Sequence, residues 1–347
     1  MTNKARISEF NFIKAISAIG IVIFHYAIET GNLSLLPGNY SWGGVFVTVF
    51  FMVSGALLYY NYDEPQNIRL FYYKRWKSLL PSFYVAFLCL YIIQVIQNRN
   101  FFYSGHPATL LLTVIGQDGY LYDIIPNYYL LGEWFLGAIL ILYVLYPFLV
   151  KMINKSQMLT TVIISALCII SLAFNIPYLS GFRSVLSCIF SFVLGIIIEK
   201  NKLYTHKWLI IPATICFIAV NYLITNNEVN LSSHIGGISL FFILFAIGHF
   251  VYYSKTIGKF SDYLSAISYD IFLIHHVMIM QLIKFIPRTN NVLSNAVFLI
   301  VSILLILIAA TIFAKIMRLL KNSTVFLSID KWILKKANQP NNIITIK

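Results

Sequence analysis

Among the ionisable side chains within otherwise apolar stretches of the sequence, the five main candidates are Lys14, His25, Glu133, Asp270 and His275, with His249 and His276 as secondary ones. An ionisable group in an apolar span costs about 2.5–3.5 kcal/mol on insertion scales, so each of them is a functional candidate. A histidine with a carboxylate nearby can be held in one tautomer and can act as a general acid or base near neutral pH. The chemistry that these residue types favour is therefore proton transfer.

Lys14 and His25 lie eleven residues apart in the first apolar stretch. At about 100° per residue this spacing puts both side chains on one helix face, with a rise of about 16 Å between them. Such a face suits a ligand whose anionic end stays near one membrane surface while its reactive end reaches inward. The alternative is that Lys14 extends to the interface and that His25 is a hydrogen-bonded interior histidine.

Counting along the helices predicts a cluster of three titratable groups. His25 and His275 lie roughly 20 Å from the inner ends of their spans, and Glu133 lies about 6 Å from the outer end of its own. We expect all three in the outer third of the bilayer, where they could form an acid–base group. Asp270 lies about 140° round the helix from His275 and is interpreted as a structural hydrogen-bonding residue.

The second apolar stretch contains the adjacent small residues Ser54 and Gly55. Small residues let two helices approach closely, so helix packing is the simplest interpretation. An acylated nucleophile at Ser54 is the alternative, although the local sequence supplies no base to activate it.

Basic and aromatic residues alternate in residues 69–81, which lead into the third apolar stretch. Arginine side chains bind phosphate groups in a bidentate manner and aromatic rings stack on flat bases, so this segment could bind an anionic nucleotide. A basic loop also fixes the cytoplasmic side of a membrane protein, which is the alternative interpretation. The sequence contains no glycine-rich phosphate loop, no HExxH motif and no C-x-x-C pair, so no metal site is expected.

The elements that must position these residues are membrane helices. Of the 347 residues, 59% are hydrophobic and 11% are charged, whereas a soluble domain has roughly 45–50% and about 25%. Lipid must therefore act as the apolar solvent, which excludes a soluble enzyme, a secreted disulfide scaffold and a disordered chain. The net charge of +13 comes from short basic clusters between apolar stretches, so we expect no nucleic-acid partner.

We predict an all-α polytopic helix bundle with about ten transmembrane helices and no soluble domain. The predicted spans are roughly residues 7–29, 42–62, 76–97, 129–150, 158–178, 184–199, 207–225, 235–253, 262–285 and 292–319. With the N-terminus inside, nearly all Lys and Arg residues fall on the inner side, and the outer side receives only Arg99, Arg183, Lys284 and Arg288. This asymmetry predicts a multi-pass plasma-membrane protein with both termini in the cytoplasm. Residues 1–320 are expected to form the membrane domain, and residues 321–347 a basic cytoplasmic tail with a surface helix followed by disordered chain.

The motifs taken together resemble the integral-membrane acyltransferase family type 3, bacterial O-acyltransferases that modify surface glycans. The matching segments are the basic position and His25 in the first span, and residues 51–55, 74–84, 133–147 and 268–275. They occur in the expected order and cover nearly the whole chain. Two positions depart from the family pattern, because Lys14 and Ser78 stand where the family usually has arginine.

The resemblance implies an acyl-CoA donor, usually acetyl-CoA, and a hydroxyl of a cell-surface or exopolysaccharide sugar as acceptor, in a glycan or a lipid-linked sugar. The residues expected to bind the anionic end of the donor are Lys14, Arg69, Lys74 and Arg75. The residues expected in catalysis are His25, as general base or acylated nucleophile, and Glu133 and His275, as groups that orient it. The expected partners are acyl-CoA, the acceptor, the lipid bilayer and glycan-assembly proteins.

Two other classes of protein remain open on the sequence. A transporter or flippase for a lipid-linked sugar or a small anion would also use intramembrane histidine and glutamate, as proton relays. Its inverted repeats are not evident in this sequence. A non-catalytic membrane sensor or scaffold is the third interpretation, and it explains the polar cluster poorly. The acceptor, the acyl length, the oligomeric state and the choice between direct transfer and an acyl-histidine remain open.

Overall fold

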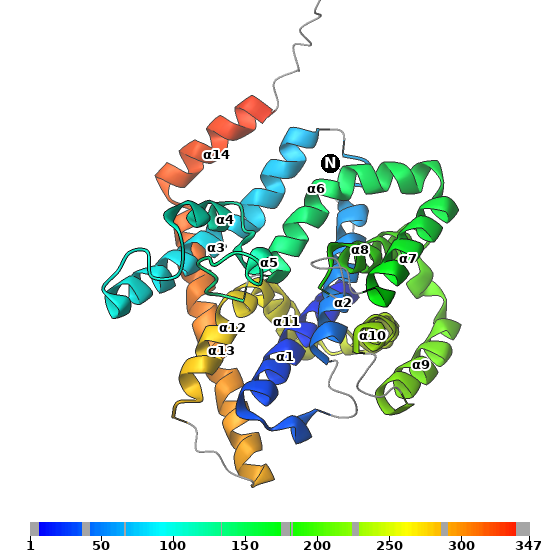
Figure 1. Cartoon of the computed structure of the whole chain (residues 1–347). Helices are drawn as coiled ribbons and strands as arrows, with labels where there is room; N and C mark the ends of the chain where they lie inside the picture. Colours follow the sequence, from blue (N-terminus) through cyan, green and yellow to red (C-terminus); the bar gives the residue numbers. More distant parts are fainter. Residues whose placement is uncertain are drawn as a thin grey trace, which may run out of the picture.

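A computed structural model of the chain describes residues 7–36, 42–65, 67–132, 134–174, 181, 183–223, 229–285 and 291–337. In these ranges every regular element is a helix and no β-strand occurs. The predicted all-α fold is therefore confirmed for the described part of the chain. Figure 1 shows α1 and α2 at the centre of the bundle, with α12 and α13 on one side and α7, α8 and α9 on the other.

Among the described residues, six helices are long and apolar enough to cross a membrane. They are α1 (Ser8–Thr30), α2 (Trp42–Asn61), α3 (Ile68–Asn98), α6 (Trp134–Lys155), α10 (Val229–Val251) and α13 (Val292–Lys321). The pair α11 (Lys255–Ala266) and α12 (Ser268–Leu282) passes the same test as one span, bent by 67°. The chain is thus a multi-pass membrane protein, and its described part has six helices, or seven spans with the bent pair, that could cross a membrane by length and composition.

The remaining helices are shorter. They are η1 (Leu33–Leu35), η2 (Pro107–Thr109), α4 (Leu110–Val114), α5 (Asp118–Leu121), α7 (Gln157–Ala173), α8 (Val185–Lys200), η3 (Leu203–Thr205), η4 (Lys207–Leu209), α9 (Ile210–Leu223) and α14 (Thr324–Ala337). Every predicted span overlaps a helix or the bent pair, although α6 begins five residues after the predicted start at residue 129. Residues 175–178 and 224–225, at the ends of two predicted spans, lie outside the described residues. Because α7, α8 and α9 are shorter than the roughly 20 residues that a span needs, the count of ten crossings stays a prediction.

Close contact between α2 and α8 depends on two glycines. A Cβ atom at Gly55 would lie 2.0 Å from the Phe192 carbonyl oxygen, and one at Gly195 would lie 1.9 Å from the Met52 carbonyl oxygen. Only glycine therefore fits at either position of this crossing. The contact explains Gly55 by helix packing, and it places the neighbouring Ser54 toward the interior of the bundle.

The bend between α11 and α12 is tied to α1 by side-chain hydrogen bonds. The Asn11 side-chain amide donates to Asp262 Oδ1 at 2.9 Å, and Ser265 Oγ donates to Asn11 Oδ1 at 3.2 Å. The Tyr252 hydroxyl donates to the same Asp262 oxygen at 2.8 Å. Asn11 and Ser265 are buried, so these polar groups are satisfied by one another rather than by water. The network sets the direction in which α12 leaves the bend.

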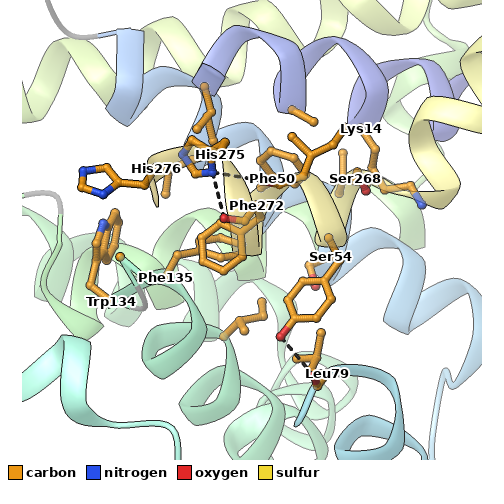
Figure 2. A pocket seen from close by; sticks show the side chains of 18 of the residues that line it. Lys14, Phe50, Ser54, Leu79, Trp134, Phe135, Ser268, Phe272, His275 and His276 are labelled. Atoms are coloured by element: carbon orange, nitrogen blue, oxygen red, sulfur yellow. Dashed lines mark hydrogen bonds between the residues drawn. The ribbon is translucent and has the colours of Figure 1, made fainter. Parts of the chain in front are cut away.

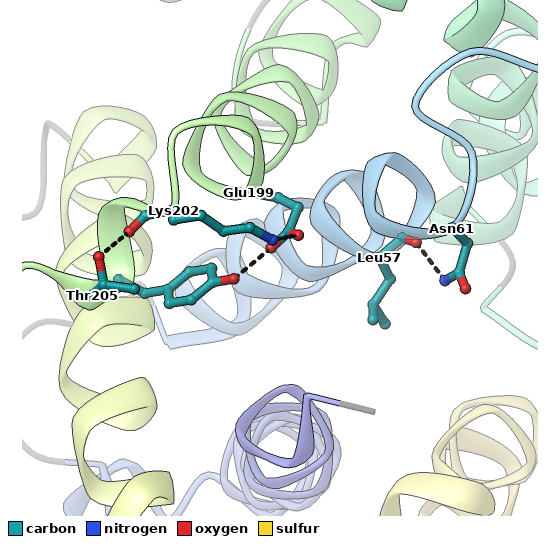
Figure 3. Close-up of polar contacts among 6 residues, drawn as sticks. Leu57, Asn61, Glu199, Lys202 and Thr205 are labelled. Atoms are coloured by element: carbon teal, nitrogen blue, oxygen red, sulfur yellow. Dashed lines mark hydrogen bonds and ion pairs between the residues drawn. The ribbon is translucent and has the colours of Figure 1, made fainter. Parts of the chain in front are cut away.

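A buried carboxylate joins the end of α8 to the neighbouring turn, as Figure 3 shows. Glu199 is only 2% exposed, forms an ion pair with Lys202 and accepts a hydrogen bond from the Tyr204 hydroxyl at 2.9 Å. The Lys202 ammonium also lies 5.2 Å from the centre of the Tyr60 ring of α2. These contacts satisfy a charge that would otherwise be costly to bury.

The last helix packs against the start of α3. Asp330 of α14 lies 2.7 Å from the Lys77 ammonium and accepts a hydrogen bond from the Tyr73 hydroxyl. The Asn67 side chain donates to the Ala337 carbonyl oxygen at 2.9 Å. The predicted tail thus contains the helix α14, its place on the cytoplasmic membrane surface stays a prediction, and residues 338–347 lie outside the described residues.

Candidate active site

One cavity of about 750 Å³ lies between α1, α2, α3, α6 and α12. The order of its lining residues along each helix distinguishes two ends. Lys14, Asn61 and Arg75 line one end, which is the inner end in the predicted topology, and Glu29 and His276 line the other. Lys14 and Glu29 are separated on α1 by a rise of about 22 Å, so the cavity follows most of that helix.

A group of aromatic side chains lines the middle of the cavity, and Figure 2 shows it between Lys14 and Ser268 on one side and His276 and Trp134 on the other. These rings are Phe50, Phe135 and Phe272, and each of them lines the cavity. The Phe135 ring centre lies 5.9 Å from that of Phe50 and 5.3 Å from that of Phe272. The lining in the middle of the cavity is therefore apolar.

Three imidazole rings meet beyond this aromatic group. The ring centre of His25 on α1 lies 5.1 Å from that of His275 and 5.3 Å from that of His276, both on α12. All three line the cavity. The structure thus brings His25 and His275 together, as the depth count predicts. Glu133, the third member of the predicted cluster, lies outside the described residues.

His275 is held in one tautomer by its own helix. Its Nδ1 atom lies 2.8 Å from the Phe272 carbonyl oxygen and 3.1 Å from that of Ile271. Carbonyl oxygens only accept hydrogen bonds, so this network assigns the ring proton to Nδ1 and leaves a lone pair on Nε2. Nε2 is buried and has no hydrogen-bond partner among the described residues. The ring therefore offers a proton-accepting atom.

His276 faces a carboxylate that the sequence analysis did not identify. Its Nε2 atom lies 3.7 Å from Glu29 Oε1, and Glu29 also lines the cavity. Glu29 follows His25 by four residues, so helix periodicity puts both side chains on one face. This spacing is the feature of the sequence that points to Glu29. Its position at the end of the first predicted span made it resemble an ordinary interfacial residue.

The basic end of the cavity is formed by Arg75 and Lys14. The Arg75 guanidinium carbon lies 5.4 Å from the centre of the Tyr62 ring and 5.8 Å from that of Tyr143. Its Nε atom is buried without a hydrogen-bond partner in the described part of the chain. Two aromatic rings thus hold the side chain, while part of its hydrogen-bonding capacity remains unused.

The other two basic residues predicted to bind the donor lie elsewhere. Arg69 is exposed and does not line the cavity. Lys74 also does not line it, and its ammonium lies 5.8 Å from the centre of the Tyr62 ring. Lys74 is half-buried, so only Arg69 of the two is exposed, and a role for either residue in donor binding stays a prediction.

Ser54 and Asp270 are the two other polar candidates from the sequence, and neither of them forms a hydrogen bond with the histidines. Ser54 lines the cavity, and its Oγ atom lies 3.2 Å from the Tyr143 hydroxyl, so its hydrogen-bond partner is not a strong base. Asp270 does not line the cavity and interacts electrostatically with Lys321 of α13. In the described residues no group of three or more His, Cys, Asp or Glu side chains is arranged to hold a metal ion.

Comparison with known proteins gives one match. No curated protein and no solved structure matches the chain. Residues 7–315 match a family model described as an acyltransferase domain, and this range includes every residue that lines the cavity. The matched range also covers nearly all of the 347 residues. The chain therefore belongs to the acyltransferase 3 family, a family of membrane acyltransferases.

Proposed function

We propose that the protein is a membrane O-acyltransferase. It moves an acetyl or other short acyl group from cytoplasmic acyl-CoA to a hydroxyl of a cell-surface or exopolysaccharide sugar. The observation that carries this proposal is the single cavity that has Arg75 at its basic end and His25 and His275 farther along. A thioester that enters at the basic end can reach the imidazoles without leaving the protein.

The two ends of the cavity suit the two ends of acyl-CoA. The phosphates of the donor would bind to Arg75 and Lys14, because a guanidinium matches phosphate geometry and an ammonium supplies a second positive charge. The long, uncharged arm of the donor would pass Phe50, Phe135 and Phe272, where the lining is apolar. The thioester would then lie next to His25.

The chemistry needs a proton acceptor for the acceptor hydroxyl. The Nε2 lone pair of His275 supplies one, and His25 is its nearest imidazole neighbour. In direct transfer the base takes the hydroxyl proton, the oxygen bonds to the thioester carbon, and the carbon–sulfur bond breaks. The proton then passes to the leaving CoA sulfur. In the stepwise route a ring nitrogen of His25 bonds to the thioester carbon, the carbon–sulfur bond breaks, and the ring proton leaves with the CoA sulfur. The hydroxyl oxygen then attacks the acyl-imidazole, His275 Nε2 takes the hydroxyl proton and passes it to the His25 ring, and the carbon–nitrogen bond breaks.

Radiolabelled acetyl-CoA tests the proposal with the full chain in proteoliposomes and sugar acceptors. We expect wild type to release CoA and label the acceptor. His25→Ala should lose both activities with its expression and insertion intact, because it loses a reacting imidazole. His249→Ala is the matched control, since His249 is 55% exposed and does not line the cavity. Label transfer by His25→Ala at the wild-type rate would remove His25 from the reaction, and acceptor movement without labelling would identify a transporter.

A further inference from the structure

The outer end of the cavity contains a carboxylate and an imidazole that the reaction described above does not use. Glu29 lies one helical turn beyond His25 on α1, and Lys14 lies near the other end of the same helix. Residues from the two ends of α1 therefore line opposite ends of the cavity. The donor enters from the end that contains Arg75, and its thioester stops at the histidines. Space lined by Glu29 and His276 therefore lies beyond the reach of the donor phosphates and belongs to a second ligand.

The two groups lie within ion-pair distance without a direct hydrogen bond between them. Glu29 Oε1 and His276 Nε2 are 3.7 Å apart, which is too long for a direct hydrogen bond. Neither side chain has a hydrogen bond to any other described residue, and they are 28% and 33% exposed. A hydroxyl oxygen placed about 2.8 Å from each atom would donate its proton to the carboxylate and accept one from the ring.

The charges around this pair differ from those at the basic end, because Glu29 and Arg183 have opposite signs whereas Arg75 and Lys14 are both cations. The carboxylate of Glu29 repels an anion, whereas the basic end formed by Arg75 and Lys14 attracts one. The other described charge at the outer end is Arg183, whose guanidinium carbon lies 5.3 Å from the centre of the Trp134 ring. This end of the cavity thus combines a hydrogen-bond acceptor in the Glu29 carboxylate, a hydrogen-bond donor in the His276 ring and a flat aromatic side chain in Trp134.

We propose that Glu29 and His276 bind the hydroxyl-bearing acceptor, and that they form the site for a polyol such as a sugar. This inference rests on the proposed acyl transfer, and it assigns the two residues to acceptor binding rather than to donor binding. His276 lies next to His25, with its ring edge-on at 90°. A hydroxyl held between Glu29 and His276 therefore places a neighbouring hydroxyl of the same polyol near the reacting imidazoles.

The test compares acceptor and donor kinetics of Glu29→Gln and His276→Gln in the full chain. The acceptor probes are the n-octyl glycosides of glucose, galactose and N-acetylglucosamine, whose tails partition into lipid while the sugar faces the cavity. The donor is acetyl-CoA, and its KM at saturating acceptor reports donor binding in either route. In the stepwise route, CoA release without any acceptor also reports the donor half of the reaction. We expect both variants to raise the acceptor KM at least tenfold, with the donor KM and acceptor-independent CoA release within twofold of wild type.

Two further variants separate binding from a general structural effect. Glu29→Asp keeps the carboxylate and should restore part of the acceptor affinity. Glu9→Gln is the matched control, because Glu9 is also on α1 and pairs with His249 at 3.4 Å but does not line the cavity. We expect Glu9→Gln to leave the acceptor KM unchanged.

Each contrary outcome has a distinct meaning. An unchanged acceptor KM in both variants overturns the assignment, and so does an equal loss of acceptor-independent CoA release, which would place the pair in the donor reaction. A wild-type protein that releases CoA but acylates none of the glycosides shows that the outer end is not a polyol site. A wild-type protein that neither releases CoA nor acylates any probe contradicts the proposed function itself.

Discussion

At the scale of single residues, the two neighbouring histidines differ in what holds them. His275 is fixed by two carbonyl oxygens of its own helix, and its Nε2 atom can only accept a proton. For His25 no described residue supplies a hydrogen bond, although its ring lies against two other imidazoles. A fixed base next to a less constrained imidazole is consistent with one residue that takes the proton and another that contacts the acyl group.

Arg75 offers the sharpest test of donor binding. Arg75→Glu should raise the KM for acetyl-CoA by about tenfold or more, because a charge-assisted hydrogen bond contributes about 1.5–3 kcal/mol. Arg75→Lys should have a smaller effect, since it keeps the charge and loses the planar fork. Steady-state CoA release measures both. Arg69→Glu is the control, because it makes the same change of charge at a residue outside the cavity. An equal rise of the acetyl-CoA KM in this variant would show that the charge of the segment, and not the position of Arg75 in the cavity, governs donor binding.

The sequence predicts some of these residue positions and not others. The helical period is enough to place Lys14 and His25 on one face, and counting depth along the helices is enough to bring His275 close to His25. It does not predict the ring proton of His275, which depends on two carbonyl oxygens. Nor does it select Arg75 over Lys74, because that choice depends on how α3 is rotated against α6.

At the scale of helices, the crossing of α2 and α8 positions Ser54 and the aromatic residues before it. Gly55→Ala should lower stability by about 1–3 kcal/mol, because the added methyl group would overlap the Phe192 backbone. Thermal unfolding of the purified protein in detergent measures this as a lower midpoint. Gly248→Ala is the milder comparison, since its Cβ would lie 3.3 Å from a Phe12 ring carbon. Equal midpoints for Gly55→Ala and wild type would mean that the crossing is looser than described.

The contact between α14 and α3 should depend on pH. Hydrogen bonds from Lys77 and Tyr73 lower the pKa of Asp330 below its usual value. A lowered pKa in the folded state means that the contact stabilises the protein above the unfolded-state pKa of about 3.9 and is lost as the pH falls further. We therefore expect α14 to separate from α3 only below about pH 4, and Asp330→Asn to remove this dependence.

Spin labels at positions 72 and 335 measure that separation, in a background without the exposed Cys89 and Cys216. The distance distribution should stay narrow at pH 7 and broaden under acid in the wild type. In Asp330→Asn it should be broad at both pH values. A narrow distribution in the variant at neutral pH would show that Asp330 does not hold the helix.

The sequence predicts the helices better than their bends. Each predicted span overlaps a helix or the bent pair, because an apolar stretch bounded by polar residues is a strong signal. The 67° break between Ala266 and Ser268 was not predicted, because no proline or glycine marks it. That break is stabilised by Asn11, which lies far away in the sequence.

At the scale of the whole molecule, the cavity joins two chemically different ends. The basic end contains Arg75 and Lys14, and the opposite end contains Glu29 and His276, with His25 and His275 between them. The distribution of Lys and Arg in the loops predicts that the basic end faces the cytoplasm and that both termini lie on that side. This orientation stays a prediction, and it determines from which side a donor must come.

The central claim is that a thioester entering at the basic end reaches His25. Bromoacetyl-CoA tests it most directly, because an imidazole nitrogen displaces the bromide and keeps a covalent label. With the reagent on the Arg75 side of sealed vesicles, we predict that mass spectrometry finds the label on His25 or His275. Excess CoA should prevent the labelling, Arg75→Glu should weaken it, and the same reagent on the opposite side should give none. Labelling confined to exposed lysines and cysteines, unaffected by CoA and sparing both histidines, would contradict the account.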